Sequence, residues 1–352
     1  MKYACALALT VGLLAAALWS GQASAQAAPQ GACIPGPPGP PNPNSPPAPP
    51  ARNVTVSAIP GVVAAGVPWT QVWYTNGNNA DGIIPDRDGS LLVAQKDNDT
   101  VLRIRADGST EVAVPRALGI GSLQMDSAGK LYGVHRAELP TSTKPHAASV
   151  INEVSILAPA RGSVATKWVG GAPLTLRPND LAFDAQGGAY FTGTCVYYGD
   201  AAGARVASEV TGTNGIAMAA DGKTLYVTSG NSVVAYDVAG PGRLASQREF
   251  AKLPDNARGD GLAIDAEGRL YVSSFRPGVN VYAPNGSHLG TIPTPRDAIS
   301  VAFAGPDRRT MYIVGTGATG ANGQPLQGGP QRTSATIYSL PMLAQGRADR
   351  AK

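Results

Sequence analysis

The sequence predicts an all-β protein, a six-bladed β-propeller, and three observations lead to it. Glycine and proline number 43 and 30 among 352 residues, a frequency that helical bundles and coiled coils avoid. A strand–turn–strand pattern recurs six times. Its spacing is close to the length of a four-stranded propeller blade. The hydrophobic share of 43% is ample for a sizeable core.

Each copy of the pattern is an apolar strand, a tight turn with Asp and usually Gly, and a second apolar strand. The copies occupy residues 84–93, 124–132, 182–191, 217–227, 263–272 and 302–313, and in most of them a third strand follows. The aligned positions of the second strand are Leu92, Tyr132, Tyr190, Tyr226, Tyr271 and Tyr312. Successive positions are 40, 58, 36, 45 and 41 residues apart. An open solenoid is the competing architecture, but solenoid repeats vary less in length and need polar caps.

The two ends of the repeated region are expected to close the ring. The early segment 72–74 and the late segment 335–338 both have strand-like sequences. Closure leaves only short, protected sheet edges. We therefore expect the propeller to span residues 53–345, followed by a basic C-terminal tail at 346–352.

The residues before the propeller read as an export signal and a spacer. Lys2 precedes an Ala- and Leu-rich apolar run at 4–19, and Ala23-Ser24-Ala25 is a small-x-small cleavage pattern. We expect residues 1–25 to be removed by a cut after Ala25. An uncleaved anchor is the alternative, although the run is short for a bilayer. Residues 26–52 form a proline-rich arm, with ten prolines in 35–50, typical of an extended polyproline-like chain.

These features predict a soluble periplasmic or secreted protein with no membrane span in its mature chain. Removing the signal leaves Cys33 and Cys195. In an oxidising compartment the pair could form a disulfide, and two free thiols are the open alternative, because sequence does not show whether the residues meet.

A second set of aligned residues lies five positions before the first turn residue of each copy. We call these the axial positions: Asp81, Gly121, Asn179, Asn214, Asp260 and Ile299. They begin the first strand of each hairpin, which in a propeller lines the central channel, so they should converge on the axis at one end. Any single Asp-Gly or Asn-Gly is a common turn dipeptide, but turn formation does not require four such residues to share a register.

The four polar axial residues make an oxygen-only ligand set. Two carboxylates and two amide oxygens suit a hard divalent cation, Ca²⁺ above all, with Zn²⁺ or Mn²⁺ as alternatives. Four protein ligands would leave coordination places for water and substrate, as a catalytic metal needs. The aspartates within the hairpin turns are instead predicted to be structural: Asp86, Asp126, Asp184 and Asp265.

Several stretches resemble the senescence-marker-protein / gluconolactonase / luciferin-regenerating-enzyme family. They are residues 177–184 (beginning Arg-Pro-Asn-Asp), 213–217 with 221–227, and 259–265. The resemblance covers roughly residues 70–340 and implies a six-bladed propeller with one divalent metal at the channel mouth. Many family members hydrolyse sugar lactones, and related propellers hydrolyse organophosphates. By motif, Asn179, Asn214 and Asp260 resemble metal-site residues, Asp260 also the catalytic carboxylate, and Arg177 with Asn179 the substrate-contacting residues.

The chain departs from the family pattern in two places. Asp81 stands where the family has a Glu in a Glu-Gly-Pro-like motif, and Asp is one methylene shorter. Either the loop moves inward or the metal is held through water. In addition, residues 191–198 are apolar and aromatic where sugar lactonases often contact hydroxyls, which suggests a less polar substrate.

Other classes of function lack their signatures. The net charge of +4 comes without a basic cluster, so no nucleic acid is expected as a partner. Three histidines and three cysteines are too few for a zinc cluster, and no Gly-x-Ser-x-Gly elbow, P-loop or dinucleotide fingerprint occurs. Each histidine is by default a surface or packing residue, and His135 is the one we would choose if any were catalytic.

The sequence thus predicts a secreted, metal-dependent hydrolase that opens a lactone, with a small molecule as its substrate. The metal would polarise the carbonyl and Asp260 would accept a proton from the attacking water. The main alternative is a non-catalytic propeller scaffold with a structural metal, because fold does not fix function. A propeller lyase or phosphotriesterase that uses the same site is a third possibility.

Overall fold

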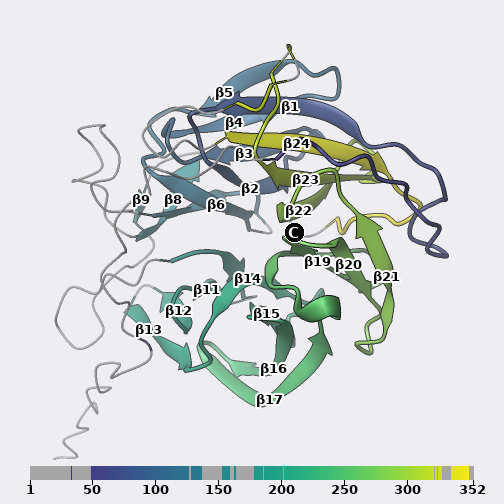
Figure 1. The fold of residues 1–352 in the computed structure, drawn as a ribbon. Coiled ribbons are helices and arrows are strands. Elements are labelled where there is room, and N and C mark those ends of the chain that lie inside the picture. The colour runs from purple at the N-terminus through teal and green to yellow at the C-terminus, as the bar shows by residue number, and fades with distance from the viewer. Residues whose placement is uncertain are drawn as a thin grey trace, which may run out of the picture.

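The computed structural model is a ring of six four-stranded antiparallel sheets (Figure 1). It describes residues 33, 49–126, 128–136, 153–158, 162–163, 178–184, 186–200, 202–320, 322, 324–326 and 334–348. The predicted signal (1–25), most of the proline-rich arm and the end of the C-terminal tail lie outside these residues. The predicted fold class, an all-β six-bladed propeller, is confirmed.

The first three blades follow one another along the chain. Blade 1 is β2 (Ala80–Pro85), β3 (Leu91–Gln95), β4 (Thr100–Ile104) and β5 (Thr110–Val114). Blade 2 is β6 (Ile120–Met125), β7 (Leu131–His135), β8 (Glu153–Ala158) and β9 (Gly162–Ser163). Blade 3 is β10 (Leu181–Phe183), β11 (Ala189–Thr192), β12 (Val196–Asp200) and β13 (Gly203–Ser208).

The last three blades complete the ring. Blade 4 is β14 (Thr213–Met218), β15 (Thr224–Ser229), β16 (Ser232–Gly240) and β17 (Arg243–Lys252), followed by a 3₁₀ turn at Pro254–Asn256. Blade 5 is β18 (Gly259–Ile264), β19 (Leu270–Ser274), β20 (Gly278–Tyr282) and β21 (His288–Pro293). Blade 6 is β22 (Ala298–Ala304), β23 (Thr310–Thr316), β24 (Ser334–Pro341) and β1 (Thr70–Asn76).

Blade 6 joins the two ends of the propeller. Its outermost strand, β1, comes from the start of the repeated region and pairs antiparallel with β24, with Trp73 opposite Ile337 and Thr75 opposite Ala335. The two strands lie side by side in Figure 1 although most of the chain separates them. The prediction that segments 72–74 and 335–338 seal the ring is therefore confirmed.

The innermost strands form the centre of the ring. The first strand of each blade contacts the first strands of both neighbouring blades, so that β2, β6, β10, β14, β18 and β22 make a closed circle. Residues at the same register of these strands therefore lie around one axis, as the axial positions require.

The hydrophobic core is divided into six clusters, one between each pair of adjacent blades. One cluster contains Ile83 of blade 1 and Ala302 of blade 6, and another contains Ile216 of blade 4 and Tyr190 of blade 3. Successive side chains of a strand point to opposite faces of its sheet, and in a propeller each face meets a neighbour. The second and third strands are consequently buried along their whole length, as β3, β19 and β20 show, and do not alternate between buried and exposed residues.

Chain segments flanking the strands fasten blades 5 and 6. Val56, Ile59 and Val62 of the N-terminal segment pack into the cluster between these blades, and Arg52 pairs with Asp297 at 2.6 Å. The predicted C-terminal tail also contacts blade 4: its second residue, Arg347, is buried, and Arg347 Nη1 donates to the Met218 carbonyl at 2.6 Å. This first part of the predicted basic tail is therefore packed against the ring.

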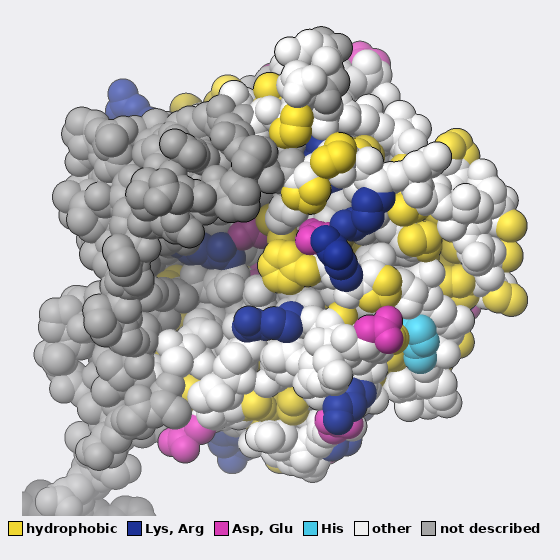
Figure 2. All heavy atoms as spheres, in the orientation of Figure 1, with side chains coloured by type: hydrophobic (Ala, Val, Ile, Leu, Met, Phe, Trp, Pro, Cys, Tyr) yellow, Lys and Arg dark blue, Asp and Glu magenta, His cyan; other side chains and the backbone are white. Residues whose placement is uncertain are grey.

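Figure 2 shows one face of the molecule with its side chains coloured by type. Lys and Arg side chains lie there in several separate places, some of them beside Asp or Glu. Among the described residues, the structure contains no helix with the length and apolar character needed to cross a membrane.

Candidate functional site

Three of the four polar axial residues lie in β-bulges at one end of the inner strands, and the fourth, Asn179, lies two residues before β10. In blades 1, 4 and 5 the regular pairing with the second strand is interrupted over two residues, and these are Asp81-Gly82, Asn214-Gly215 and Asp260-Gly261. A bulge leaves its residues outside the ladder and re-aims their side chains. Asp81, Asn179, Asn214 and Asp260 are all half-buried, so each keeps some contact with solvent.

The glycine after each axial residue is explained by close packing around the axis. A Cβ on Gly215 would lie 2.2 Å from the Asp260 carbonyl oxygen, and one on Gly82 would lie 2.6 Å from the Ser122 Cα. Only a residue without a side chain permits neighbouring inner strands to approach this closely. The Asp-Gly and Asn-Gly pairs are thus part of the inner strands and do not form turns.

Threonine hydroxyls of the second strands link one blade to the axial residue of the next. Thr228 Oγ1 accepts from the Gly215 amide at 2.7 Å and donates to the Asp260 carbonyl at 3.0 Å. Thr192 Oγ1 donates to the Asn214 carbonyl in the same way. These bonds fix the backbone of Asn214 and Asp260 from the neighbouring blade.

Blade 3 differs from the others because an aspartate follows its axial residue. The Asp180 side chain is buried, and its Oδ1 accepts from the Ser122 hydroxyl of blade 2 at 2.5 Å and from the Leu181 amide at 2.9 Å. Its Oδ2 accepts from the Ile216 amide of blade 4 at 3.3 Å. One carboxylate therefore connects three blades directly beside Asn179.

Arg136 brings two axial residues together. It follows β7 of blade 2, and its Nη1 donates to Asp81 Oδ2 of blade 1 at 2.7 Å. Its Nη2 donates to the side-chain oxygen of Asn179 in blade 3 and to the Asn179 carbonyl at 3.2 Å. Side-chain oxygens from two non-adjacent blades thus converge on one cationic group. The Asp81 carboxylate is therefore paired with a cationic group of the protein itself, the Arg136 guanidinium.

The donor set fits a divalent cation in its chemistry. The described residues hold no group of three or more His, Cys, Asp or Glu that could bind a metal ion, so a cation here would need the amide oxygens of Asn179 and Asn214 beside the carboxylates of Asp81 and Asp260. Hard oxygen ligands of this kind are those of Ca²⁺. The convergence of Asp81 and Asn179 on a guanidinium shows that this end of the ring accommodates positive charge.

Sequence reasoning missed Arg136 and its counterpart in blade 1. This counterpart is Lys96, which follows β3 as Arg136 follows β7. The Lys96 amide donates a hydrogen bond to the Asn79 carbonyl, and the Arg136 amide donates one to the Gly119 carbonyl. The Lys96 side chain is 4% exposed. Both residues stand four positions after the aligned residue of their copy, Leu92 or Tyr132. Two basic residues at one aligned position were the signal available in the sequence.

Other predicted site residues lie elsewhere. Arg177 and His146 are outside the described residues. His135 is buried, with Nδ1 on the Leu118 carbonyl and Nε2 on the Ser155 hydroxyl, so it packs blade 2. His288 is exposed on β21, where partial burial lowers the pKa of its imidazole.

The turn aspartates are structural, as expected. Asp265 Oδ1 accepts the amides of Glu267 and Arg269, both at 2.9 Å, and its Oδ2 accepts from the Tyr271 hydroxyl at 2.9 Å. Burial is the main cause that raises the pKa of the Tyr271 hydroxyl well above its usual range, and the neighbouring Asp265 carboxylate is the second. Asp184 repeats the arrangement with the Gly188 amide and the Tyr198 hydroxyl.

The interpretation of residues 191–198 as a lining for a less polar substrate is wrong. Phe191, Tyr197 and Tyr198 are at most 2% exposed and belong to the clusters on the two sides of blade 3. Their apolar character reflects a blade core buried on both faces.

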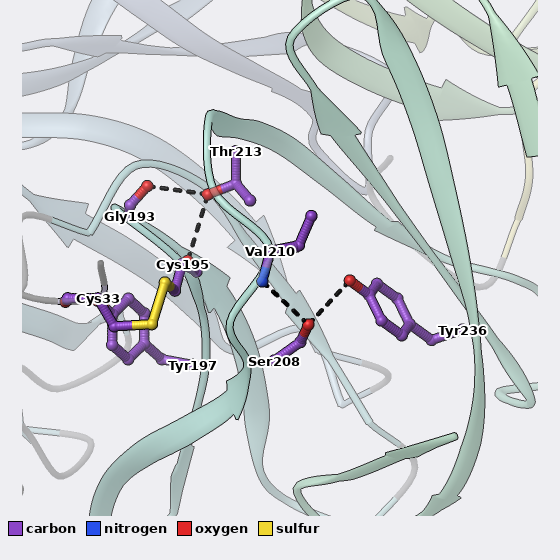
Figure 3. The surroundings of a disulfide bond; sticks show 8 residues. All are labelled: Cys33, Gly193, Cys195, Tyr197, Ser208, Val210, Thr213 and Tyr236. Carbon is purple, nitrogen blue, oxygen red and sulfur yellow. Dashed lines mark hydrogen bonds between the residues drawn. A yellow bond between two sulfur atoms is a disulfide. The ribbon is translucent and has the colours of Figure 1, made fainter. Parts of the chain in front are cut away.

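A disulfide anchors the loop beside Asn214. Cys33 and Cys195 are bonded, with their Cα atoms 5.3 Å apart, which decides between the two alternatives for this pair. The Tyr197 hydroxyl donates to the Cys33 carbonyl at 2.5 Å. Thr213, the residue before Asn214, donates to the carbonyls of Gly193 and Cys195 at 2.9 and 3.3 Å (Figure 3). The covalent link therefore lies close to the start of β14.

Parts of this chain are similar to known proteins. Residues 147–317, which include Asn179, Asn214 and Asp260 but neither Asp81 nor Arg136, match the family model for the SMP-30/gluconolactonase/LRE-like region. Regucalcin of Xenopus laevis is 33% identical over 109 residues, 29% of this chain and 36% of that protein. A pentonolactonase of Haloferax volcanii is 28% identical over 144 residues, 39% of this chain and 49% of that protein.

The chain thus spans between a third and a half of the length of these curated relatives. The solved structure of a gluconolactonase from Xanthomonas campestris superposes with a TM-score of 0.64 at 20% identity, covering 86% of this chain and 99% of that one. This likeness shows the fold. Residues 147–317 thus match the SMP-30/gluconolactonase/LRE-like region, and they lie within a six-bladed β-propeller.

Proposed function

We propose that this protein is a metal-dependent lactonase, which opens a cyclic ester of a small molecule with water. The observation that carries the proposal is the alignment of Asp81, Asn179, Asn214 and Asp260, all half-buried, at one end of a closed ring of inner strands. Support also comes from the family region that contains three of these residues and from the lactonase names among the relatives.

In this proposal Asp81, Asn179, Asn214 and Asp260 would hold a divalent cation, with Ca²⁺ favoured by the oxygen-only set. When bound, such a cation supplies a Lewis acid for the ester carbonyl. The remaining chemistry belongs to the protein. Asp260, whose backbone Thr228 holds at 3.0 Å, would accept the proton of the attacking water as general base. Asn179, and Arg177 two residues before it, would contact the substrate.

We further propose that the protein works in the periplasm or outside the cell. The Cys33–Cys195 disulfide supports this location, because disulfides persist in oxidising compartments and are rare in the cytosol. N-terminal sequencing of the protein from a cell envelope fraction tests the expected cut after Ala25. A mature chain that still begins at Met1 would contradict it.

The activity is tested by a pH-stat assay over a panel of sugar and aliphatic lactones. The protein is stripped with EDTA and assayed with and without Ca²⁺, Mn²⁺ or Zn²⁺. Turnover that disappears on stripping and returns with one ion supports the lactonase and identifies the ion. Turnover that survives stripping would contradict metal dependence. Silence across the panel, with Ca²⁺ bound, would count against the lactonase and favour a binding scaffold.

A further inference from the structure

Arg136 takes the place of an axial side chain in blade 2. The axial residue of that blade is Gly121, which has no side-chain atom that could bind a cation. The Arg136 side chain lies over it, since a Cβ on Gly121 would be 2.7 Å from Arg136 Nε and 2.8 Å from its Cδ. The Arg136 amide donates a hydrogen bond to the Gly119 carbonyl at 2.9 Å, which holds the backbone of Arg136 in place. Blade 2 therefore contributes a positive charge where the other polar blades contribute oxygens.

The oxygens that Arg136 binds are two of those expected to hold the cation. Its guanidinium spans from Asp81 to Asn179, and the ion pair with Asp81 is largely enclosed, with the two side chains 18% and 14% exposed. Arginine is always charged and donates in a planar fork that suits two acceptors at once. The contact is therefore a specific arrangement of donors and acceptors, well shielded from bulk water.

A cation on the same oxygens would lie against this guanidinium. Calcium–oxygen distances are about 2.3–2.6 Å, and Arg136 Nη1 is 2.7 Å from Asp81 Oδ2. An ion ligated by that oxygen would be at most about 5 Å from the guanidinium nitrogen. Like charges at this separation repel appreciably even in a polar medium. In addition, Asn179 Oδ1 would have to exchange one cationic partner for the other.

We infer that Arg136 is a resident cation of the site, which competes with the divalent ion for Asp81 and Asn179. The ion binds with full affinity only when the Arg136 side chain leaves these oxygens, so Arg136 sets the ion concentration at which the site fills. The inference rests on the proposed function in so far as it takes these oxygens to be the metal ligands. Two of the residues concerned, Asp81 of blade 1 and Arg136 of blade 2, lie before the matched family region, whereas Asn179 of blade 3 lies within it.

The inference is tested by calorimetric titration of Ca²⁺ into the EDTA-stripped full chain. Arg136→Gln keeps a side chain that can donate a hydrogen bond but removes the charge. Gly121→Ala keeps the charge and displaces the Arg136 side chain. Arg103→Gln is the matched control, because Arg103 likewise bridges two acidic or polar side chains. Its partners are Asp86 and Glu111 of blade 1, each at 2.5 Å, and it lies on β4, away from the axial positions. Arg136→Gln should tighten Ca²⁺ binding about tenfold or more, and Gly121→Ala should shift it in the same direction.

Several outcomes would overturn the inference. Equal or weaker Ca²⁺ binding by Arg136→Gln would show that the guanidinium does not compete, and an equal tightening in Arg103→Gln would reduce the effect to net charge. If Arg136→Gln does not fold, Gly121→Ala decides by the same criterion. Absence of Ca²⁺ binding in every variant would overturn both the competition and the metal-dependent function. Tightened binding without lactone turnover would support the competition and count against the lactonase alone.

Discussion

The carboxylate of Asp180 accepts a hydrogen bond from the hydroxyl of Ser122 at 2.5 Å, which links blade 3 to blade 2 next to the axis. Asp180 also accepts from the Ile216 amide of blade 4. Asp180 directly follows the axial residue Asn179, and Ser122 directly follows the axial residue Gly121. The contact between Asp180 and Ser122 therefore helps to position Asn179. In the other blades a glycine or serine at this position lets the strands meet, whereas blade 3 uses a buried charge.

Replacing Asp180 should therefore damage both stability and the site. Asp180→Ala leaves the Ser122 hydroxyl and the Ile216 amide without this acceptor, and we expect a loss of about 2–4 kcal/mol in the free energy of unfolding. Asp221→Ala is the control, because Asp221 accepts from the Lys223 amide in an exposed turn, and it should cost about 1 kcal/mol or less. Urea denaturation measures both, and equal losses in the two variants would contradict the role given to Asp180.

Close packing at the axis makes a separate prediction for two glycines. Gly215→Ala would place a Cβ against the backbone of Asp260 and Gly261, and we expect it to cost about 3 kcal/mol because backbone must move. For Gly121→Ala the nearest atoms belong to the flexible Arg136 side chain, and this variant should cost less than about 1.5 kcal/mol. Chemical denaturation compares them, and a smaller loss for Gly215→Ala would show that blades 4 and 5 can separate at the axis without penalty.

The blade count and the closing strands could be predicted because each depends on local sequence. A hairpin turn favours Asp and Gly, and this local pattern recurs along the chain, although the turns of the fourth and sixth copies begin with Ala219 and Ala304 instead of Asp. The same locality placed Asp81, Asn179, Asn214 and Asp260 at one register. The position of Arg136 could not be predicted in this way, because it depends on the space left by Gly121 in another strand.

Two further features depended on contacts between blades. Residues 191–198 suggested a substrate surface because they are apolar, yet both faces of a propeller blade are buried and apolar strands are its ordinary consequence. Asp180 belongs to the Arg-Pro-Asn-Asp stretch, which gives no sign of its role. Its partners Ser122 and Ile216 lie far along the chain, so only the fold shows that it joins blades.

Reduction of the disulfide should destabilise the propeller. Cys33 and Cys195 are separated by 162 residues, and removing a native disulfide of this kind costs about 2–5 kcal/mol. We expect TCEP to lower the melting temperature of the wild-type protein. The double variant Cys33→Ser, Cys195→Ser should melt at the lower temperature with or without TCEP. A wild-type melting temperature that TCEP leaves unchanged would show that the bond carries no stability.

Buried tyrosines should make the protein sensitive to alkali. Burial raises the pKa of Tyr197 to about 12, and burial with the bond to Asp126 does the same for Tyr132. Their unfolded pKa is about 10, so the unfolded chain loses these protons first. The resulting stability is complete below pH 10 and is lost as the pH rises through 12, at about 1.4 kcal/mol per pH unit for each group.

The alkaline effect is measured by denaturation at several pH values between 10 and 12. Tyr197→Phe removes one ionisable hydroxyl, so the unfolding free energy should fall less steeply with pH, by the contribution of one proton. Phe183→Leu alters the same cluster without removing an ionisable group, so it should lower stability at every pH and leave the slope as it is. A slope unchanged in Tyr197→Phe would show that this hydroxyl does not contribute.

The role proposed for Asp260 gives the sharpest test of the chemistry. Asp260→Asn keeps the size of the side chain and one oxygen but removes the charge and the proton acceptor, so we expect turnover to fall by about 10²-fold or more. Thermal stability should stay close to that of the wild type, because Thr228 holds the backbone carbonyl of residue 260 and does not depend on its side chain. Asp255→Asn is the matched control, since Asp255 is exposed in the turn just before β18 and its loss should leave turnover intact. Full activity of Asp260→Asn on a lactone that the wild type hydrolyses would remove Asp260 from the mechanism, whereas equal losses in both variants would point to the turn rather than to the carboxylate.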